Sequence, residues 1–204
     1  MSVTKKKKNS KRTATVARKT TETDITLCLN IDGSGASKIS TGIPFFDHML
    51  TALARHALFD LELSCNGDLE VDFHHTVEDC GIALGKALEN ALGDKRGIRR
   101  FGHAYAPMDD ALVRCVVDLS GRSFLHYSIK TKKMYAGDFP IQLLEEFFRA
   151  FTNNVQANVH VELLYGRDAH HIIEAAFKAL AKALDFACQR DTRTSEIPST
   201  KGKI

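Results

Sequence analysis

The chain has 204 residues, 44% of them hydrophobic, and a formal net charge of +3, so it is long and apolar enough to fold around its own core. No apolar stretch reaches the ~20 residues of a membrane span, and the N-terminus lacks the apolar segment of a signal peptide, so we expect a cytoplasmic protein. Its five cysteines are widely spaced and odd in number, which argues against a disulfide framework and a thiolate zinc site.

Residues 1–12 form a basic tail that holds lysines at 5–8 and 11 and an arginine at 12, and without it the net charge is mildly acidic. Lysine runs without apolar neighbours are typical of solvated, disordered termini. A nucleic-acid-binding arm is the alternative, and the run alone does not favour it. We therefore predict a disordered tail and no nucleic-acid partner.

Beyond the tail, we predict two halves, residues 13–98 and 99–191, and a C-terminal tail over 192–204. The expected strands are residues 13–19, 24–31, 60–65 and 69–73 in the first half, and 111–118, 123–129 and 157–164 in the second. One helix in each half opens with a proline, Pro44 or Pro140, which suits a first helical turn. The fold class is thus α+β, with duplicated β-β-α-β-α halves, each a mixed or antiparallel sheet covered on one face by two helices.

The second helix of each half begins with a repeated motif. His74-His75-Thr-Val-Glu78 aligns without a gap on His170-His171-Ile-Ile-Glu174, 96 residues later, and the match continues into the following apolar positions. Composition alone predicts one such motif in roughly one chain in fifty, so two copies at one offset indicate an internal duplication.

The repeated residues are typical of a transition-metal site. On a helix, His75 and Glu78 share a face because they are three residues apart, and His74 at the helix start points elsewhere, so one motif can serve two ions. Imidazole with carboxylate suits Mn, Fe, Co, Ni or Zn. The alternative is that these residues are ordinary surface histidines and helix-end carboxylates. Two matched copies of the motif argue against this alternative.

The duplication predicts further ligands on the preceding helices. His48 lies 26 residues before His74, and Glu146 lies 24 residues before His170. Both side chains are good donors for manganese-type metals. Glu145 competes with Glu146 for this role, and a buried, hydrogen-bonded histidine is the alternative for His48.

Loop residues supply weaker signals for phosphate binding. The segment 99–103, the turn 120–122 and the tail 198–202 carry guanidinium, hydroxyl and ammonium donors, which bind phosphate in many proteins. Each of them is also common in ordinary loops. The short Gly-Ser-Gly stretch at 33–35 lacks a Walker or Rossmann pattern, so no nucleotide site is predicted.

Together these motifs resemble the imidazoleglycerol-phosphate dehydratase family, and only about the first dozen residues lie outside the match. The motifs that carry the resemblance are Arg18-Lys-Thr-Thr-Glu22-Thr, Gly42-Ile-Pro-Phe-Phe-Asp47-His48-Met-Leu, His74-His75-Thr-Val-Glu78-Asp, Arg100-Phe-Gly, Pro107-Met-Asp109-Asp110-Ala, Gly121-Arg122, Glu146-Phe-Phe, His170-His171-Ile-Ile-Glu174-Ala and Pro198-Ser-Thr-Lys201-Gly. We expect the monofunctional form, because the chain has no room for the phosphatase domain of bifunctional members.

The resemblance implies two Mn(II) ions per active site, sites completed by neighbouring subunits, and a 24-subunit cage. The implied metal ligands are His48, His74, His75, Glu78, Glu146, His170, His171 and Glu174. Some members carry histidine where Glu146 stands, so this ligand departs from their pattern.

The implied activity is the dehydration of D-erythro-imidazole glycerol phosphate to imidazole acetol phosphate in L-histidine biosynthesis, a carbon–oxygen hydro-lyase reaction. Metal charge beside the imidazole ring lowers the pKa of its N–H group, and the imidazolate expels hydroxide to give a diazafulvene-type intermediate. Glu22 is the expected acid/base and Asp109 the second candidate. The implied substrate-binding residues are Glu22, His56, Arg100, Arg122, Lys178, Ser199, Thr200 and Lys201, with the C-terminal tail closing on the site.

Two alternative functions would use the same types of residue. A di-metal hydrolase of a phosphorylated metabolite would use paired ions about 3.5–4 Å apart, but the imidazole-specific motifs argue against it. A metal-assembled storage protein would leave Glu22, Arg100, Arg122 and the residues at 199–201 without a purpose. Stoichiometric metal binding without turnover would favour the storage function.

Overall fold

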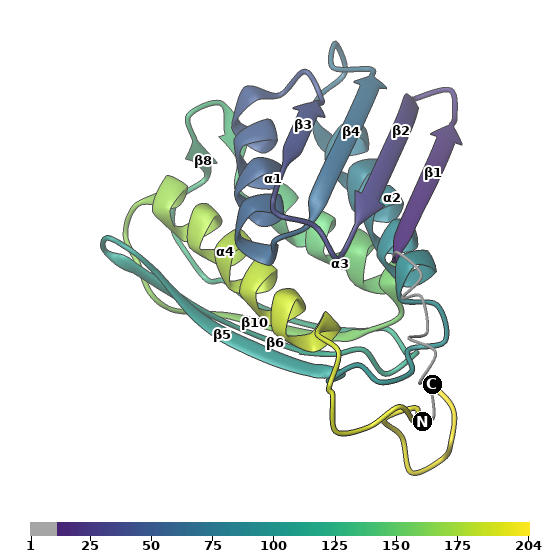
Figure 1. The fold of residues 1–204 in the computed structure, drawn as a ribbon. Coiled ribbons are helices and arrows are strands. Elements are labelled where there is room, and N and C mark those ends of the chain that lie inside the picture. Colours follow the sequence, from purple (N-terminus) through teal and green to yellow (C-terminus); the bar gives the residue numbers. More distant parts are fainter. Residues whose placement is uncertain (1–11) are drawn as a thin grey trace, which may run out of the picture.

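The computed structural model describes residues 12–204 as two similar halves (Figure 1). The predicted tail over residues 1–12 therefore lies outside the described part except for Arg12, which is buried. The first half contains β1 (Thr13–Lys19), β2 (Thr23–Asn30), β3 (Ser37–Ser40), α1 (Pro44–Ala57), β4 (Asp60–Gly67) and α2 (His74–Leu92). The second contains β5 (Phe101–Met108), β6 (Ala111–Asp118), β7 (Phe124–Ser128), β8 (Tyr135–Ala136), β9 (Phe139–Pro140), α3 (Leu143–Val155), β10 (Asn158–Tyr165) and α4 (Ala169–Cys188).

The two main sheets repeat one topology, which confirms the predicted duplication and fold class. Their strand orders are β1-β2-β4-β3 and β5-β6-β10-β7. In each sheet the first three strands are antiparallel, and the last strand pairs in parallel with its neighbour. The strands β1, β2, β4 and β3 therefore correspond to β5, β6, β10 and β7.

Several local predictions were wrong. Residues 69–73 form a turn rather than a strand, closed by a bond from the Val71 amide to the Asp68 carbonyl. Pro44 does open α1, but Pro140 belongs to β9 and α3 begins at Leu143. The structure adds β3 and also β5, whose glycine, alanines and proline do not give the apolar alternation of a typical strand.

The small residues of β5 serve the packing of α4 on the second sheet. A Cβ atom on Gly102 would lie 1.9 Å from the Ala183 carbonyl oxygen, so only glycine permits this contact between strand and helix. The opposite face of β5 exposes Phe101 and Tyr105. The small residues of β5 are therefore explained by the close approach of its backbone to α4, and not by burial of large side chains.

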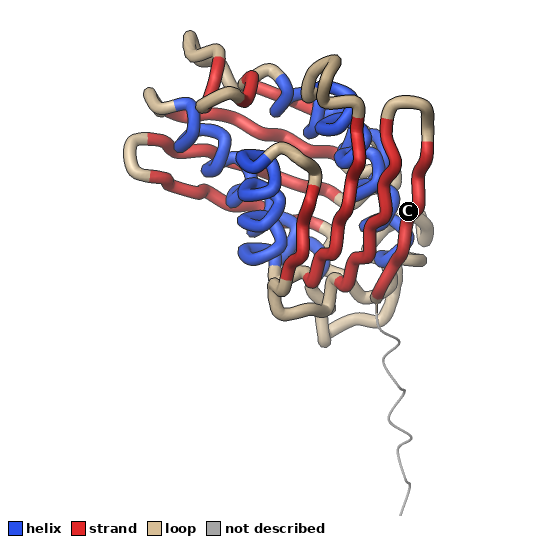
Figure 2. Tube along the Cα trace, turned by 90° about the horizontal axis from the view of Figure 1, so that it is seen from above, coloured by secondary structure: helices blue, strands red, loops and turns tan. Residues whose placement is uncertain are grey.

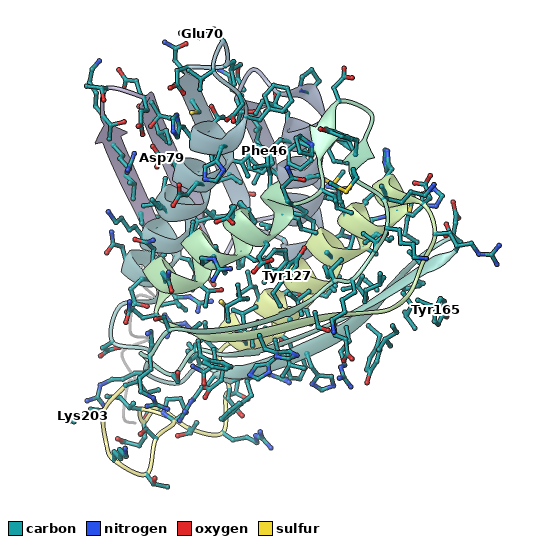
Figure 3. The ribbon with its side chains drawn as sticks, turned by 180° about the vertical axis from the view of Figure 1, so that it is seen from behind. Phe46, Glu70, Asp79, Tyr127, Tyr165 and Lys203 are labelled. Carbon is teal, nitrogen blue, oxygen red and sulfur yellow. The ribbon has the colours of Figure 1, made fainter. Side chains whose placement is uncertain are left out.

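The four long helices lie between the sheets. Helices α1 and α2 cover the first sheet, α3 and α4 cover the second, and the helix layers meet through the pairs α2–α3 and α1–α4 (Figures 1 and 2). Phe46 lies in this interior (Figure 3) and contacts the rings of Phe147 and Phe177 across the helix layers. Burial of such rings is the main stabilising term.

Over residues 12–204, none of the helices has both the length and the apolar composition required to cross a bilayer.

Candidate metal centre

Three side chains of the types that bind metals, from the two halves, meet at the N-terminal ends of α1 and α4. The Nε2 atoms of His48 and His170 lie 3.3 and 3.1 Å from Oε2 of Glu174. One donor atom from each residue lies within 4.8 Å of the others, and these form the only group of three among the residues that the structure describes. Two imidazoles and a carboxylate suit a divalent transition metal.

The start of α4 is fixed by its cap. Asp168 has an extended backbone, and its side chain accepts a hydrogen bond from the amide of His171, which satisfies a free helix N–H group. His170 and Glu174 then face the same side because they are four residues apart. The predicted pairing of the second histidine with the glutamate was wrong, because in both motifs the glutamate lies beside the first histidine. His48 approaches this face from the second turn of α1, across the contact between the two halves.

Glu174 remains a charged carboxylate although it is only 7% exposed. Burial alone raises its pKa, but the hydrogen bond and charge of Lys178, with bonds from His170 and His48, lower the pKa to about 2. Lys178 Nζ lies 2.6 Å from Oε1 of Glu174, leaving Oε2 toward the histidines. The cluster therefore holds an ionised carboxylate with one oxygen paired to Lys178 and the other directed at the two histidines.

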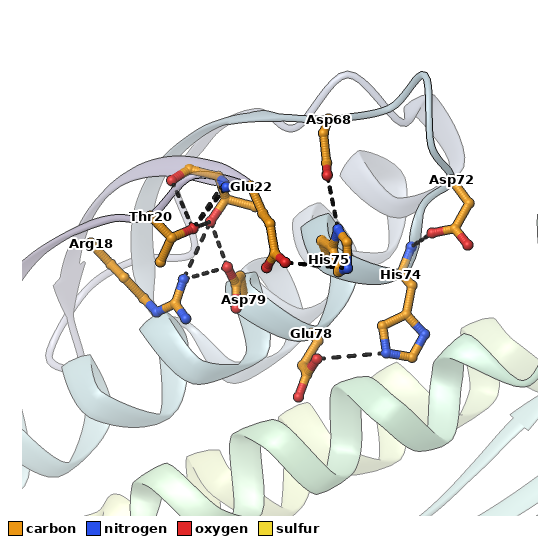
Figure 4. Close-up of polar contacts among 10 residues, drawn as sticks. Arg18, Thr20, Glu22, Asp68, Asp72, His74, His75, Glu78 and Asp79 are labelled. Atoms are coloured by element: carbon orange, nitrogen blue, oxygen red, sulfur yellow. Dashed lines mark hydrogen bonds and ion pairs between the residues drawn. The ribbon is translucent and has the colours of Figure 1, made fainter.

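The first copy of the motif gives a looser arrangement (Figure 4). His74 Nε2 lies 3.6 Å from Oε2 of Glu78. Glu146 stands on α3 with its Oε2 atom 3.8 Å from Nε of Arg149, and Glu145 also pairs with Arg149. Both glutamates lie in the first turn of α3 and share Arg149 as a partner.

The second histidine of each motif is held between carboxylates. His75 Nδ1 lies 2.9 Å from Asp68, and its Nε2 lies 3.7 Å from Glu22. In both motifs the hydrogen bond to the aspartate is the main cause that raises the imidazole pKa, through Asp68 for His75 and Asp110 for His171. Motif spacing does not predict Asp68 and Asp110 as partners, because they reach the histidines from loops outside the motifs.

His171 shows the same contacts in the second half. Its Nδ1 atom lies 2.6 Å from Asp110, and its Nε2 atom lies 3.4 Å from Asp109. The bond to His171, followed by backbone N–H groups of Arg167 and Asp168, holds the pKa of Asp110 well below its usual range. The structure therefore places the two predicted acid/base residues, Glu22 and Asp109, at equivalent positions beside the two motifs.

The turn that carries Glu22 is tied to α2 by a buried aspartate. Arg18 and Thr23 lie at the two sides of the β1–β2 hairpin. Arg18 donates a hydrogen bond to Asp79 (Figure 4), and so does Thr23. Asp79 is only 4% exposed and lies one residue after Glu78. These bonds attach the hairpin to the first motif and so place Glu22 beside His75.

The expected phosphate-binding residues lie elsewhere in the chain. Arg100 donates to Asp118 and, at 2.7 Å, to the Pro198 carbonyl, and its own amide bonds the Ala187 carbonyl near the end of α4. Because Ala187 lies 17 residues after His170 in α4, this end is ~26 Å from His170. Figure 3 likewise shows Lys203, in the C-terminal tail, at the opposite end of the molecule from Glu70.

The other predicted substrate residues divide between these two ends. Lys178 contacts Glu174 in the metal cluster. His56, in the last turn of α1, has its pKa lowered mainly by burial and then by the charge of Lys178. Exposed Arg122 and the residues Ser199, Thr200 and Lys201 belong to the far end, where the chain terminus at Ile204 packs beside Gly121. A single chain therefore does not bring the residues of the metal cluster and the residues near the chain terminus into one site.

Fold and site define a duplicated α+β protein whose helix ends gather imidazole and carboxylate donors suited to a transition metal. The family model described as imidazoleglycerol-phosphate dehydratase matches residues 41–184. The chain belongs to the imidazoleglycerol-phosphate dehydratase family, and the predicted enzyme class, a carbon–oxygen hydro-lyase, is confirmed.

Relatives and solved structures of this family match most of the chain. The imidazoleglycerol-phosphate dehydratase of Geobacter sulfurreducens is 53% identical and the match covers 95% of this chain and 99% of the relative. That of Caldanaerobacter subterraneus is 58% identical over 94% of this chain and 98% of the relative. The crystal structure of the Staphylococcus aureus enzyme is 36% identical, with a TM-score of 0.80, and covers 88% of this chain and 99% of that one. The Pyrococcus furiosus structure, a complex with (S)-C348, is 38% identical with a TM-score of 0.80, over 93% and 100% of the chains.

Proposed function

We propose that the chain catalyses the dehydration of D-erythro-imidazole glycerol phosphate to imidazole acetol phosphate in L-histidine biosynthesis, with two Mn(II) ions per active site. The observation that carries this proposal is the group of His48, His170 and Glu174, built from both halves at the helix ends that bear the family's motifs. We also propose a cytoplasmic location, supported by five cysteines that are all free thiols.

The donor set fits the proposed metal. Imidazole and carboxylate ligands suit Mn(II), and Glu174 stays ionised beside two histidines. We assign metal binding to His48, His74, His75, Glu78, Glu146, His170, His171 and Glu174. The chemistry supplied by bound Mn(II) is positive charge beside the substrate's imidazole ring, which favours loss of the ring N–H proton.

The chain's own acid/base groups handle the remaining protons. Hydroxide must leave the carbon next to the ring, and a proton must leave the neighbouring carbinol carbon. Once a diazafulvene-type intermediate has formed, that C–H group is acidic enough for a carboxylate to deprotonate. We assign this role to Glu22, whose Oε1 atom lies 3.7 Å from His75 Nε2, and keep Asp109 as the second candidate.

Substrate phosphate is proposed to bind at the far end of a second subunit. Cationic and hydroxyl donors are offered by Arg100, Arg122, Ser199, Thr200 and Lys201. Arg100 lies beside the C-terminal end of α4, and the N-terminal end of α4 carries the His48 group of the same chain. Since the substrate is much shorter than the ~26 Å between these ends, both can meet one molecule only across a subunit interface. This supports self-association, which we propose to produce the 24-subunit cage.

The test is turnover of imidazole glycerol phosphate by metal-stripped protein before and after Mn(II) is added, with oligomer mass followed on the same samples. We expect activity to return at about two Mn(II) ions per chain together with a large assembly. Metal binding and assembly without dehydration would instead favour the storage function. Hydrolysis of a phosphate ester without dehydration would favour the di-metal hydrolase.

A further inference from the structure

The second histidine of each motif has the same environment in the two halves. Asp68 lies 2.9 Å from Nδ1 of His75, and Asp110 lies 2.6 Å from Nδ1 of His171. In both rings the Nε2 atom faces the other way, toward Glu22 or Asp109. Each imidazole thus has one nitrogen held by an aspartate and one directed at the catalytic groups.

The two aspartates come from positions that the duplication does not relate. Asp110 lies in the β5–β6 turn, whose counterpart is the β1–β2 turn that carries Glu22. Asp68 follows β4, and the counterpart segment after β10 begins at Gly166. The 96-residue offset of the motifs places Leu164 opposite Asp68 instead, so neither comparison gives an aspartate at the corresponding position. Because each half makes the contact with a different loop, inheritance from one ancestral half does not explain it.

A ring held in this way has a defined tautomer. A carboxylate accepts a hydrogen bond, so it favours the tautomer with the proton on Nδ1 and leaves the Nε2 lone pair free. A metal ligand needs that lone pair, and an aspartate on the far nitrogen also fixes the ring orientation. We propose that Asp68 and Asp110 are positioning residues that orient His75 and His171 and keep their Nε2 atoms free for metal; this rests on the proposed function.

Asp110 is itself held firmly. Its Oδ2 atom accepts hydrogen bonds from the amides of Arg167 and Asp168 at 2.6 and 3.1 Å, while Oδ1 contacts the histidine. Asp168 in turn caps α4 through the amide of His171. The β5–β6 turn, the cap and the ring therefore form one connected unit.

Asp68 is linked to the acid/base turn instead. Its amide donates to the Glu22 carbonyl at 3.0 Å, and within residues 12–204 its side chain bonds His75 alone. Replacement of this carboxylate by a neutral amide therefore weakens the contact with His75 and leaves the backbone link in place. Substitution of Asp68 therefore tests its side-chain contact with His75 alone. Substitution of Asp110 also changes the bonds that its side chain accepts from the Arg167 and Asp168 amides.

The test measures Mn(II) binding to metal-stripped full-length protein, from the electron paramagnetic resonance signal of free Mn(II). We expect Asp68→Asn and Asp110→Asn to weaken the affinity about 10- to 100-fold at the affected ion. Asp60→Asn is the matched control, because Asp60 also accepts two loop amides, from Ser34 and Ala36, but contacts no histidine. It should bind Mn(II) as the wild type does.

A second measurement separates positioning from general support of the fold. In the His171→Ala background, Asp110→Asn should cause no further loss of Mn(II) affinity, because its effect acts through the ring. An equal loss in that background, or wild-type affinity in both single aspartate variants, would overturn the inference while leaving the dehydratase proposal intact. Wild-type protein that binds no Mn(II) would overturn the proposed metal chemistry and this inference with it.

Discussion

His48 in α1 and Glu174 in α4 lie 3.3 Å apart between Nε2 and Oε2, which joins a residue of the first half to the repeated motif of the second. The two residues are 126 positions apart in the sequence. This contact depends on the packing of α1 against α4, and that packing is part of the hydrophobic core. Formation of the candidate metal centre is therefore coupled to docking of the two halves.

Replacement of Glu174 by Gln should lower the metal content from about two Mn(II) ions per chain toward one. The amide keeps the shape but removes the charge that attracts a cation, and it is a weaker ligand. Metal analysis after gel filtration provides the measurement. Asp185→Asn, on the same helix but outside the cluster, should retain full metal content; unchanged metal in Glu174→Gln would exclude Glu174 as a ligand.

Replacement of Glu22 by Gln should act mainly on turnover. The amide cannot accept a proton, so we expect kcat to fall about 10²- to 10⁴-fold with KM changed only a few-fold. Steady-state kinetics with saturating Mn(II) measure the split. Glu70→Gln changes a carboxylate that lines the same surface pocket and should have little effect. An unchanged kcat in Glu22→Gln would remove Glu22 from the acid/base role.

The sequence predicted the parts of this protein that follow a local period or an exact repeat. The motif helices, the duplication and the fold class depend on such signals. It did not predict β5, because the Gly102 contact with α4 follows from backbone proximity. Nor did it predict Asp68 and Asp110 as partners of the histidines, or the distance between Arg100 and His170, since these depend on how loops and helices pack.

Arg12 should contribute to stability more than its place beside the basic tail indicates. The side chain is 9% exposed, forms a two-pronged bond with Asp32 and donates to the Cys188 carbonyl at 2.6 Å. Arg12→Lys cannot reproduce this fork, so it should lower the free energy of unfolding by about 1–3 kcal/mol. Calorimetry on metal-free protein would show a lower Tm.

The matched control is Arg193→Lys, which breaks a similar pair with Asp191 at an arginine that is 86% exposed, and should change stability by less than about 0.5 kcal/mol. The Arg12 bond is the largest cause that lowers the pKa of Asp32 from 3.8. A lowered carboxyl pKa stabilises the fold above the unfolded pKa, and this contribution disappears as the pH falls below it. The Arg12→Lys defect should therefore shrink below about pH 3.8; a defect that grows there would contradict the assignment.

Gly85→Ala should destabilise the protein although it lies inside a helix. Alanine normally improves a helix interior by about 1 kcal/mol relative to glycine. Here a Cβ atom would lie 2.6 Å from the carbonyl oxygen of Phe151 on α3, so the helices must separate, at a cost of about 1–3 kcal/mol. Asn90→Ala, at an exposed position of α2, should be neutral or slightly stabilising. A stabilised Gly85→Ala protein would show that the α2–α3 contact is looser than described.

Mixing two inactive variants should restore activity if the active site forms between subunits. His170→Ala removes a residue at the metal end of α4, and Lys201→Ala removes one at the tail end, so each pure assembly contains only defective sites. When the two metal-free proteins are mixed in equal amounts and reassembled with Mn(II), about one quarter of the interfacial sites should combine an intact His170 with an intact Lys201 from another chain. Steady-state assays before and after reassembly measure the recovery. A site contained within one chain would give no intact combination, and the mixture would stay as inactive as its two components.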